Sequence, residues 1–123
     1  MRNDLSFSEC LVTELSFGRK KIFFTVFYRN PEYKAGSKGF QDFLENFENM
    51  QVKISSEKPF ATFFTGDVNG HTQEWFPEGD TNAEGIKLDK LFSNLNLIQI
   101  IDKPTHFFRN DCTPSCIDTI LTD

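Results

Sequence analysis

The sequence FATFFTGDVNGH, residues 60–71, begins as an apolar run and ends in polar side chains. Residues 60–65 predict a short strand of the kind that is buried in a layered sheet. Asp67, Asn69 and His71 follow directly, and Gly66 and Gly70 leave room for close approach of backbone or ligand. This pattern has two interpretations: polar groups delivered to a functional crevice, or an Asx-type turn that ends the strand.

The functional interpretation rests on side-chain direction. Side chains two apart in an extended chain point the same way, so Asp67 and Asn69 are expected to face one crevice, with Val68 in the core. An aspartate can orient and deprotonate a water, and an asparagine can hydrogen-bond an anionic oxygen without adding negative charge. Such a pair suits water attack on a phosphodiester, with a metal ion neutralising the phosphate.

The flanking segments predict alternating strands and helices. Strand-like runs at 9–16 and 21–28 are separated by Phe17-Gly18-Arg19-Lys20, which favours a hairpin. Apolar residues spaced by three and four predict a helix from Phe40 to Met50, and 55–59 is expected to be a loop.

The second half of the chain repeats this alternation. Thr81 and Glu84 match a capping box, which predicts the start of a second helix, and Asn94 or Asn96 is suited to end it. Strands are expected at 97–101 and 116–121. The order of elements predicts an α/β domain with helices packed on a sheet, and a sheet made of these strands alone would expose its edges and one apolar face.

Composition limits the class of protein. The chain has 123 residues, a net charge of -5 and 25% charged residues, which favours one soluble globular domain over residues 1–123. No stretch approaches the roughly 20 apolar residues of a membrane span, and the N-terminus does not resemble a signal peptide. We therefore expect a nuclear or cytoplasmic protein without a membrane partner. Because the net charge is negative, a nucleic-acid partner would need a local basic or polar surface.

The cysteines and histidines raise one rival site. Three cysteines fit a reducing compartment better than a disulfide framework. His106, Cys112 and Cys116, with His71 or Cys10, could be imagined as a zinc site. Zinc motifs usually pair their ligands in two knuckles, however, and the sequence has only one close cysteine pair. Ordinary buried or loop cysteines are the better interpretation.

Four motifs in order carry a family resemblance: Tyr28-Arg29-Asn30-Pro31, Gly66-Asp67-Val68-Asn69 with His71, Pro104-Thr105-His106, and Ser115-Cys116-Ile117-Asp118. Together they resemble the endonuclease/exonuclease/phosphatase superfamily, and within it the endonuclease domain of LINE-type (non-LTR) retrotransposons. The resemblance implies about the second half of a four-layer α/β sandwich, with a mostly antiparallel sheet and helices on its outer face. The chain would then be truncated at both ends.

The resemblance also implies residue roles. Asp67 would align or activate the attacking water, Asn69 and Tyr28 would bind the scissile phosphate, and Asp118 would orient a catalytic histidine. Substrate-binding positions would be Thr105, Ser115, Asn30 and His71. Asn30 departs from the family pattern, which more often has proline there, and the role of His71 is not defined by the resemblance.

Among the family residues that have no counterpart in this sequence, two are central to catalysis. The glutamate that is the principal metal ligand is expected upstream, and the catalytic histidine is expected downstream. The resemblance therefore implies a fragment of a Mg²⁺-dependent endonuclease that nicks target DNA to prime reverse transcription, with a reverse transcriptase domain in the parent polyprotein. Mg²⁺ would belong to the intact domain. The alternatives are a non-catalytic remnant that binds nucleic acid or a protein, and a lipid or inositol phosphate phosphodiesterase, which the two later motifs do not favour.

Overall fold

The computed structural model describes residues 1–103, 105 and 118–122. Within these residues the elements follow the predicted order of strands and helices. They are β1 (Cys10–Phe17), β2 (Lys20–Tyr28), α1 (Lys38–Ser56), β3 (Ala61–Asp67), α2 (Ala83–Asn94), β4 (Ile98–Gln99) and β5 (Asp118–Thr122).

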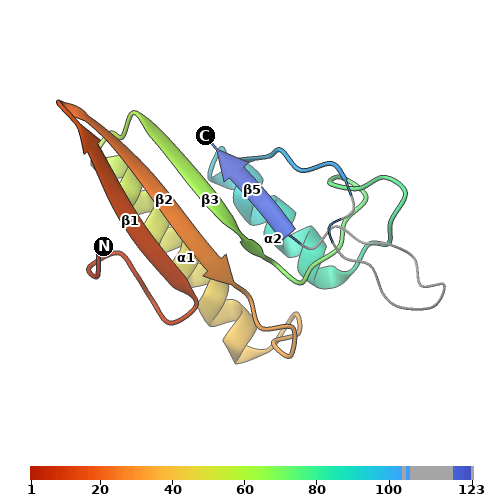
Figure 1. Cartoon of the computed structure of the whole chain (residues 1–123). Coiled ribbons are helices and arrows are strands. Elements are labelled where there is room, and N and C mark those ends of the chain that lie inside the picture. Colours follow the sequence, from red (N-terminus) through yellow and green to blue (C-terminus); the bar gives the residue numbers. More distant parts are fainter. Residues whose placement is uncertain (104, 106–117, 123) are drawn as a thin grey trace.

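The strands form one mixed sheet in the order β1-β2-β3-β5-β4. β2 and β3 are parallel, and the other three neighbouring pairs are antiparallel. The parallel pair requires a crossover, which α1 provides behind the sheet (Figure 1). The expected α/β layer with a mostly antiparallel sheet is therefore confirmed.

The hairpin between β1 and β2 turns through Gly18 and Arg19, since Phe17 pairs with Lys20. Gly18 has a φ of 60°, in the left-handed region that glycine adopts readily. A glycine at the first position of a two-residue loop is typical of the type II′ turn, whose twist matches that of the strands.

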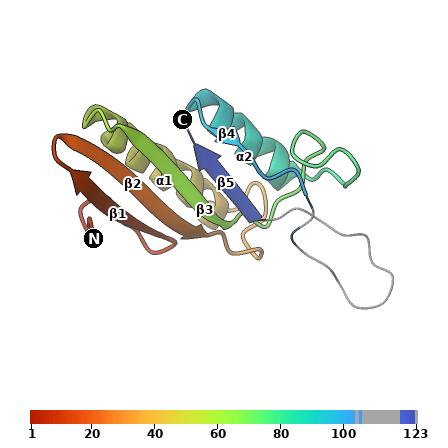
Figure 2. The ribbon, with the colours of Figure 1, turned by 45° about the horizontal axis from the view of Figure 1, so that its top comes forward.

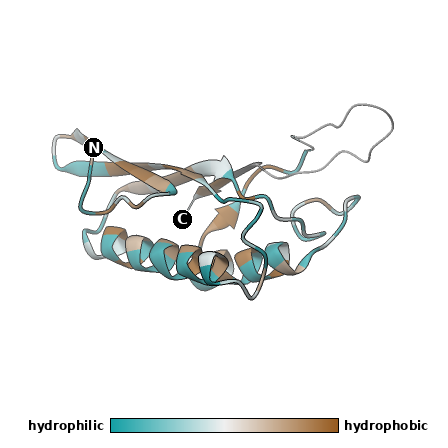
Figure 3. Ribbon diagram, turned by 90° about the horizontal axis from the view of Figure 1, so that it is seen from below, coloured by the Kyte–Doolittle hydropathy of each residue, from teal (hydrophilic) through white to brown (hydrophobic). Residues whose placement is uncertain are grey.

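The core lies between the sheet and the two helices, which cover the same face of the sheet (Figures 2 and 3). Phe47 of α1 is fully buried at its centre. Its ring lies 5.6 Å from that of Phe27 on β2, 5.3 Å from Phe64 on β3 and 5.4 Å from Phe92 on α2. Aromatic packing therefore joins both helices to the central strands.

Several element bounds differ from the prediction, three of them with a clear physical reason. α1 continues to Ser56, so residues 55–56 are helical, because Gln51 and Ile54 extend the buried face by one more turn. Asn82, one residue after Thr81, is the N-cap of α2, and its side chain accepts from the Gly85 N–H. β4 is limited to Ile98–Gln99. The Ile100 N–H still donates to the Ile120 carbonyl, but the backbone N–H groups of Ile101 and Ile120 donate to the Gln99 Oε1 atom.

The other face of the sheet carries apolar side chains, and neither of the two described helices covers it (Figure 3). Val26 is 57% exposed and Ile98 is 62% exposed. The remaining large exposed residues of this open face are Leu11, Leu15, Phe17, Phe24 and Tyr28. The expected apolar face is therefore present.

Candidate active site

Three of the predicted catalytic positions lie in one row across neighbouring strands. Tyr28, the last residue of β2, pairs with Asp67, the last residue of β3, and Asp67 pairs with Asp118, the first residue of β5. Positions that are separated by 39 and 51 residues in the sequence thus meet at one end of the sheet. Tyr28 is 54% exposed there, at the end of the open face.

Gly66 allows β2 and β3 to approach closely just before this row. A Cβ atom at Gly66 would lie 1.9 Å from the Phe27 carbonyl oxygen, well inside any real contact. The glycine is therefore required by the backbone of the neighbouring strand.

The backbone turns at Asn69, contrary to the extended conformation that the sequence suggested. β3 ends at Asp67, and Asn69 has a φ of 47°, in the left-handed region that asparagine tolerates. The Asp67 Oδ1 atom accepts a hydrogen bond from the Asn69 N–H at 2.8 Å, which forms an Asx turn. The two residues are thus close because the turn joins them. The turn interpretation is confirmed, and the functional one stays a prediction.

The side chain of Asn69 points back to the strand end of β2. Its Nδ2 atom donates to the Arg29 carbonyl at 2.7 Å. An amide nitrogen carries two N–H groups, and this bond uses one of them. Val68, between the two polar residues, is fully buried, as predicted.

Asn30 and His71 hold the loops that flank the site. The Asn30 Oδ1 atom accepts from the Glu32 N–H at 2.9 Å, in another Asx turn. The His71 N–H donates to the Asn82 side chain at 3.0 Å, and the Asn82 N–H donates to the His71 carbonyl at 2.9 Å. Gly85 makes this contact possible, because a Cβ atom there would lie 1.9 Å from the His71 oxygen.

The remaining predicted positions have less structural definition. Thr105 is a described residue and is partly buried. Ser115 lies outside the described residues, as do His106, Cys112 and Cys116 of the rival zinc set, and for Asp118 the structure describes the backbone pairing alone.

Arg29 belongs to the first of the four motifs, but the sequence assigned it no role. It is 1% exposed and lies between the two loops of the site. Burial lowers the pKa of its guanidinium, and the charges of Glu84 and Asp67 oppose that shift. Its place directly after β2, two residues before Pro31, was the available signal.

The donor set does not fit a complete metal site. In the described part of the chain, no group of three or more histidine, cysteine, aspartate or glutamate residues is placed to hold a metal ion. Cys10 is buried, which raises the pKa of its thiol to about 12 and keeps it a neutral, unreactive group at physiological pH.

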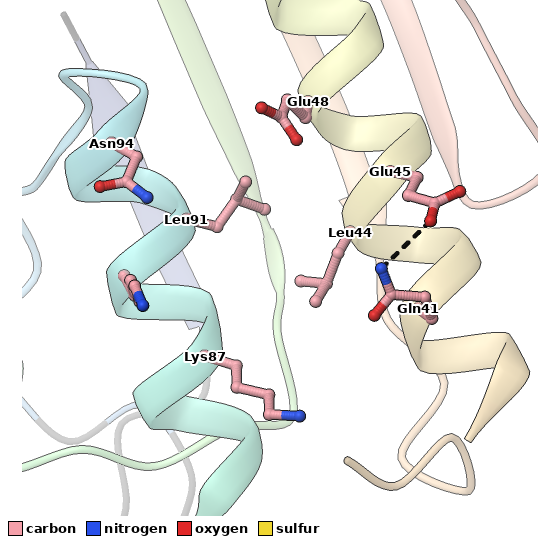
Figure 4. A pocket seen from close by; sticks show the side chains of 8 residues that line it. Gln41, Leu44, Glu45, Glu48, Lys87, Leu91 and Asn94 are labelled. Atoms are coloured by element: carbon pink, nitrogen blue, oxygen red, sulfur yellow. Dashed lines mark hydrogen bonds between the residues drawn. The ribbon is translucent and has the colours of Figure 1, made fainter. Parts of the chain in front are cut away.

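A groove between α1 and α2 lies apart from these residues, on the helical side of the sheet. Leu44 and Leu91 point toward each other across it, with acidic side chains on α1 and Lys87 on α2 (Figure 4). None of the candidate site residues lines it. Among the described residues, no helix is long and apolar enough to cross a membrane.

The chain was compared with known protein families, curated proteins and solved structures, and only the solved structures gave a match. No protein-family model matches the chain, and no curated protein matches it. Among solved structures, the endonuclease domain of TRAS1, a telomere-specific non-LTR retrotransposon, matches with a TM-score of 0.76 and 20% sequence identity. The match covers 96% of this chain and 52% of that one, so the chain spans about half the length of the similar domain. The protein therefore has a nuclease-like fold, similar to part of a non-LTR retrotransposon endonuclease domain.

Proposed function

We propose that this chain is part of a DNA endonuclease domain of the endonuclease/exonuclease/phosphatase type, which nicks target DNA for retrotransposition in a non-LTR, LINE-type element. The observation that carries the proposal is the row of Tyr28, Asp67 and Asp118 on three neighbouring strands, with Asn69 joined to Asp67. The likeness in fold to the TRAS1 endonuclease domain supports it.

Each residue of this group has a chemical role in water attack on phosphorus. The Asp67 carboxylate orients the water and accepts its proton. The second N–H of the Asn69 amide and the Tyr28 hydroxyl donate to the phosphate oxygens, which carry the charge that develops during attack. Asp118 orients a histidine from another part of the domain. Thr105, Ser115, Asn30 and His71 contribute substrate contacts or hold the loops that make them.

The intact domain would supply what these residues lack. No group of three or more metal-ligating side chains is found among the described residues. The principal metal ligand, a glutamate, and the catalytic histidine would come from the rest of the parent domain. The open face would be covered by a second sheet, because two apolar sheet faces pack against each other about 10 Å apart. With helices on both outer faces, the result would be a four-layer sandwich. The reverse transcriptase would be a further domain of the same polyprotein.

The phosphate-binding half of the proposal is testable with this chain alone. The chain is titrated with a short DNA duplex, and amide chemical shifts are recorded by NMR. The shifts of Tyr28 and of residues 66–70 are expected to change first. The variant Asn69→Ala is expected to weaken binding by about tenfold, the effect of losing one hydrogen bond to a charged group. Asn94→Ala, an exposed amide on α2, is the matched control. Shifts confined to the groove between α1 and α2, or none at all, would contradict the proposal.

The catalytic half predicts an inactive chain. Purified protein with Mg²⁺ is expected to leave supercoiled plasmid intact, because the glutamate and histidine are supplied elsewhere. Nicking that disappears in Asp67→Ala would refute this expectation.

The second candidate function is a non-catalytic remnant that binds nucleic acid or a protein. The incomplete donor set favours it. A monodisperse protein or a defined dimer, together with DNA binding that Asn69→Ala leaves unchanged, would support this candidate over the endonuclease.

A further inference from the structure

Arg29 makes an unusual set of contacts for a buried charge. Its guanidinium donates hydrogen bonds to four backbone carbonyls, and to no carboxylate among the described residues. The acceptors are the oxygens of Val68 and Asn69 in one loop, and of Asn30 and Tyr33 in the other, with 3.0 Å to Asn30 and 2.7 Å to Tyr33.

The backbone of Arg29 also bonds to the segment around Asp67 and Asn69. Its N–H donates to the Asp67 carbonyl at 2.9 Å, and its carbonyl accepts from the Asn69 side chain at 2.7 Å. The carbon at the centre of the guanidinium lies 5.2 Å from the ring centroid of Phe40 on α1. One residue thus connects the ends of β2 and β3 to the first turn of α1.

A structural role in the core alone does not account for this arrangement. Burying a guanidinium is costly, and an apolar side chain of similar volume would fill the same space without that cost. Arginine differs in having five N–H donors in a rigid fork, which can satisfy several carbonyls at fixed angles. The loops that it satisfies are those that carry Tyr28, Asp67 and Asn69.

We propose that Arg29 is the positioning residue of the candidate site, and that its guanidinium holds the left-handed turn at Asn69 in the one conformation that presents the amide beside Asp67. The inference rests on the proposed function. Arg29 itself touches no substrate: it acts through the carbonyls of Val68 and Asn69 and through the Asn69 side chain.

The first measurement needs no ligand. In Arg29→Lys, hydrogen exchange of residues 66–71 and 30–34 is expected to rise by about tenfold or more, the effect of losing a charge-assisted hydrogen bond, while exchange in β1 stays near that of the wild type. Lysine keeps the charge but not the fork, so it is not expected to restore protection. Arg29→Gln, which keeps two N–H donors, is a second variant that serves if the lysine variant unfolds.

Phe40→Leu is the matched control. It loosens the packing on the same side of Arg29 and leaves the four carbonyl contacts in place. A rise in exchange that is uniform across the chain in Arg29→Lys, or no rise at all, would overturn the inference. The same would follow if Phe40→Leu loosened residues 66–71 as strongly as Arg29→Lys.

The second measurement separates this inference from the proposed function. In the DNA titration, Arg29→Lys is expected to lose the shifts at Asn69 and to bind about tenfold more weakly than the wild type. If the wild type gives no shifts at the site, the proposed function fails, and the exchange pattern alone decides whether Arg29 holds the two loops. If the wild type binds and Arg29→Lys binds equally well, only the positioning role fails.

Discussion

Gly66 is under a tight steric constraint where β3 approaches β2 beside the site. Its φ is not in the left-handed region, so backbone conformation is not what demands glycine here. The demand comes from the Phe27 carbonyl of the neighbouring strand, 1.9 Å from where a Cβ atom would lie. A methyl group would push β2 and β3 apart next to Tyr28 and Asp67.

Gly66→Ala is therefore expected to destabilise the fold by on the order of 3 kcal/mol, the upper range for overpacking a closed site. Urea denaturation followed by circular dichroism measures the loss. Thr65→Ala, an exposed position on the same strand, is the control and is expected to change stability by less than about 1 kcal/mol. Equal losses in the two variants would argue against a steric role for Gly66.

At the scale of elements, the start of α2 and the loop after β3 are one unit. Asn82 caps the helix through the Gly85 N–H at 2.8 Å and accepts from the His71 N–H with the same oxygen. The capping box at Thr81 was a reasonable prediction from sequence spacing. It was wrong because the Thr81 hydroxyl accepts from the Gln73 N–H, across the loop that precedes the helix.

Asn82→Ala is expected to cost about 1–2 kcal/mol, the usual effect of losing an N-cap. Thr81→Ala is expected to cost less than about 0.5 kcal/mol, since it removes one exposed hydrogen bond outside the cap. Thermal and urea unfolding measure the loss of stability in both variants. A larger loss in Thr81→Ala than in Asn82→Ala would support Thr81 as the N-cap.

At the scale of the whole molecule, the open face is the dominant exposed feature. The two described helices cover one side of the sheet (Figure 3). Val26 on β2 is 57% exposed on the other side, and it pairs with Leu11 on β1 and Thr65 on β3. Contiguous apolar surface of this kind binds hydrophobic dyes and promotes association.

We expect the chain to enhance the fluorescence of the dye ANS, and Val26→Lys to lower that enhancement by about half or more, because a charge interrupts the apolar surface. Val52→Lys is the matched control, since Val52 is 58% exposed but lies on α1. If both variants reduced dye binding equally, the open face would not be the binding surface.

A network of ion pairs connects the N-terminal segment to β1 and to the residue after α1, away from the site. Arg2 pairs with Glu14 on β1 at 2.6 Å and with Glu57 after α1 at 3.0 Å. The hydrogen bonds from Arg2 lower the pKa of both carboxyl groups from their ordinary value of 4.5. Groups of this kind stabilise the fold above their unfolded pKa and lose that contribution as the pH falls through the lowered folded value.

Arg2→Gln is therefore expected to reduce Tm most near neutral pH, and the difference from the wild type should shrink once the pH falls below 4.5. Lys38→Gln, which removes an exposed pair with Asp42, is expected to change Tm little at any pH. A constant difference between wild type and Arg2→Gln from pH 7 to 3 would contradict the linkage.

The sequence by itself determined the elements and the site candidates. Apolar periodicity identified the strands and both helices, because the strand and helix repeats place the same side chains in the core. The run at 60–71 marked Asp67, Asn69 and His71, and the motifs added Tyr28 and Asp118. Bounds moved by a few residues where long-range contacts decided them, as at Ser56 and Gln99.

Only the tertiary structure decided how the site is held together. The row of Tyr28, Asp67 and Asp118 depends on strand register, which pairs residues far apart in the chain and leaves no local sequence signal. The left-handed turn at Asn69 overrides the extended geometry that period-two spacing suggested. Arg29 shows the same limit most clearly, because four carbonyls from two loops can share one guanidinium only after the sheet has brought those loops together.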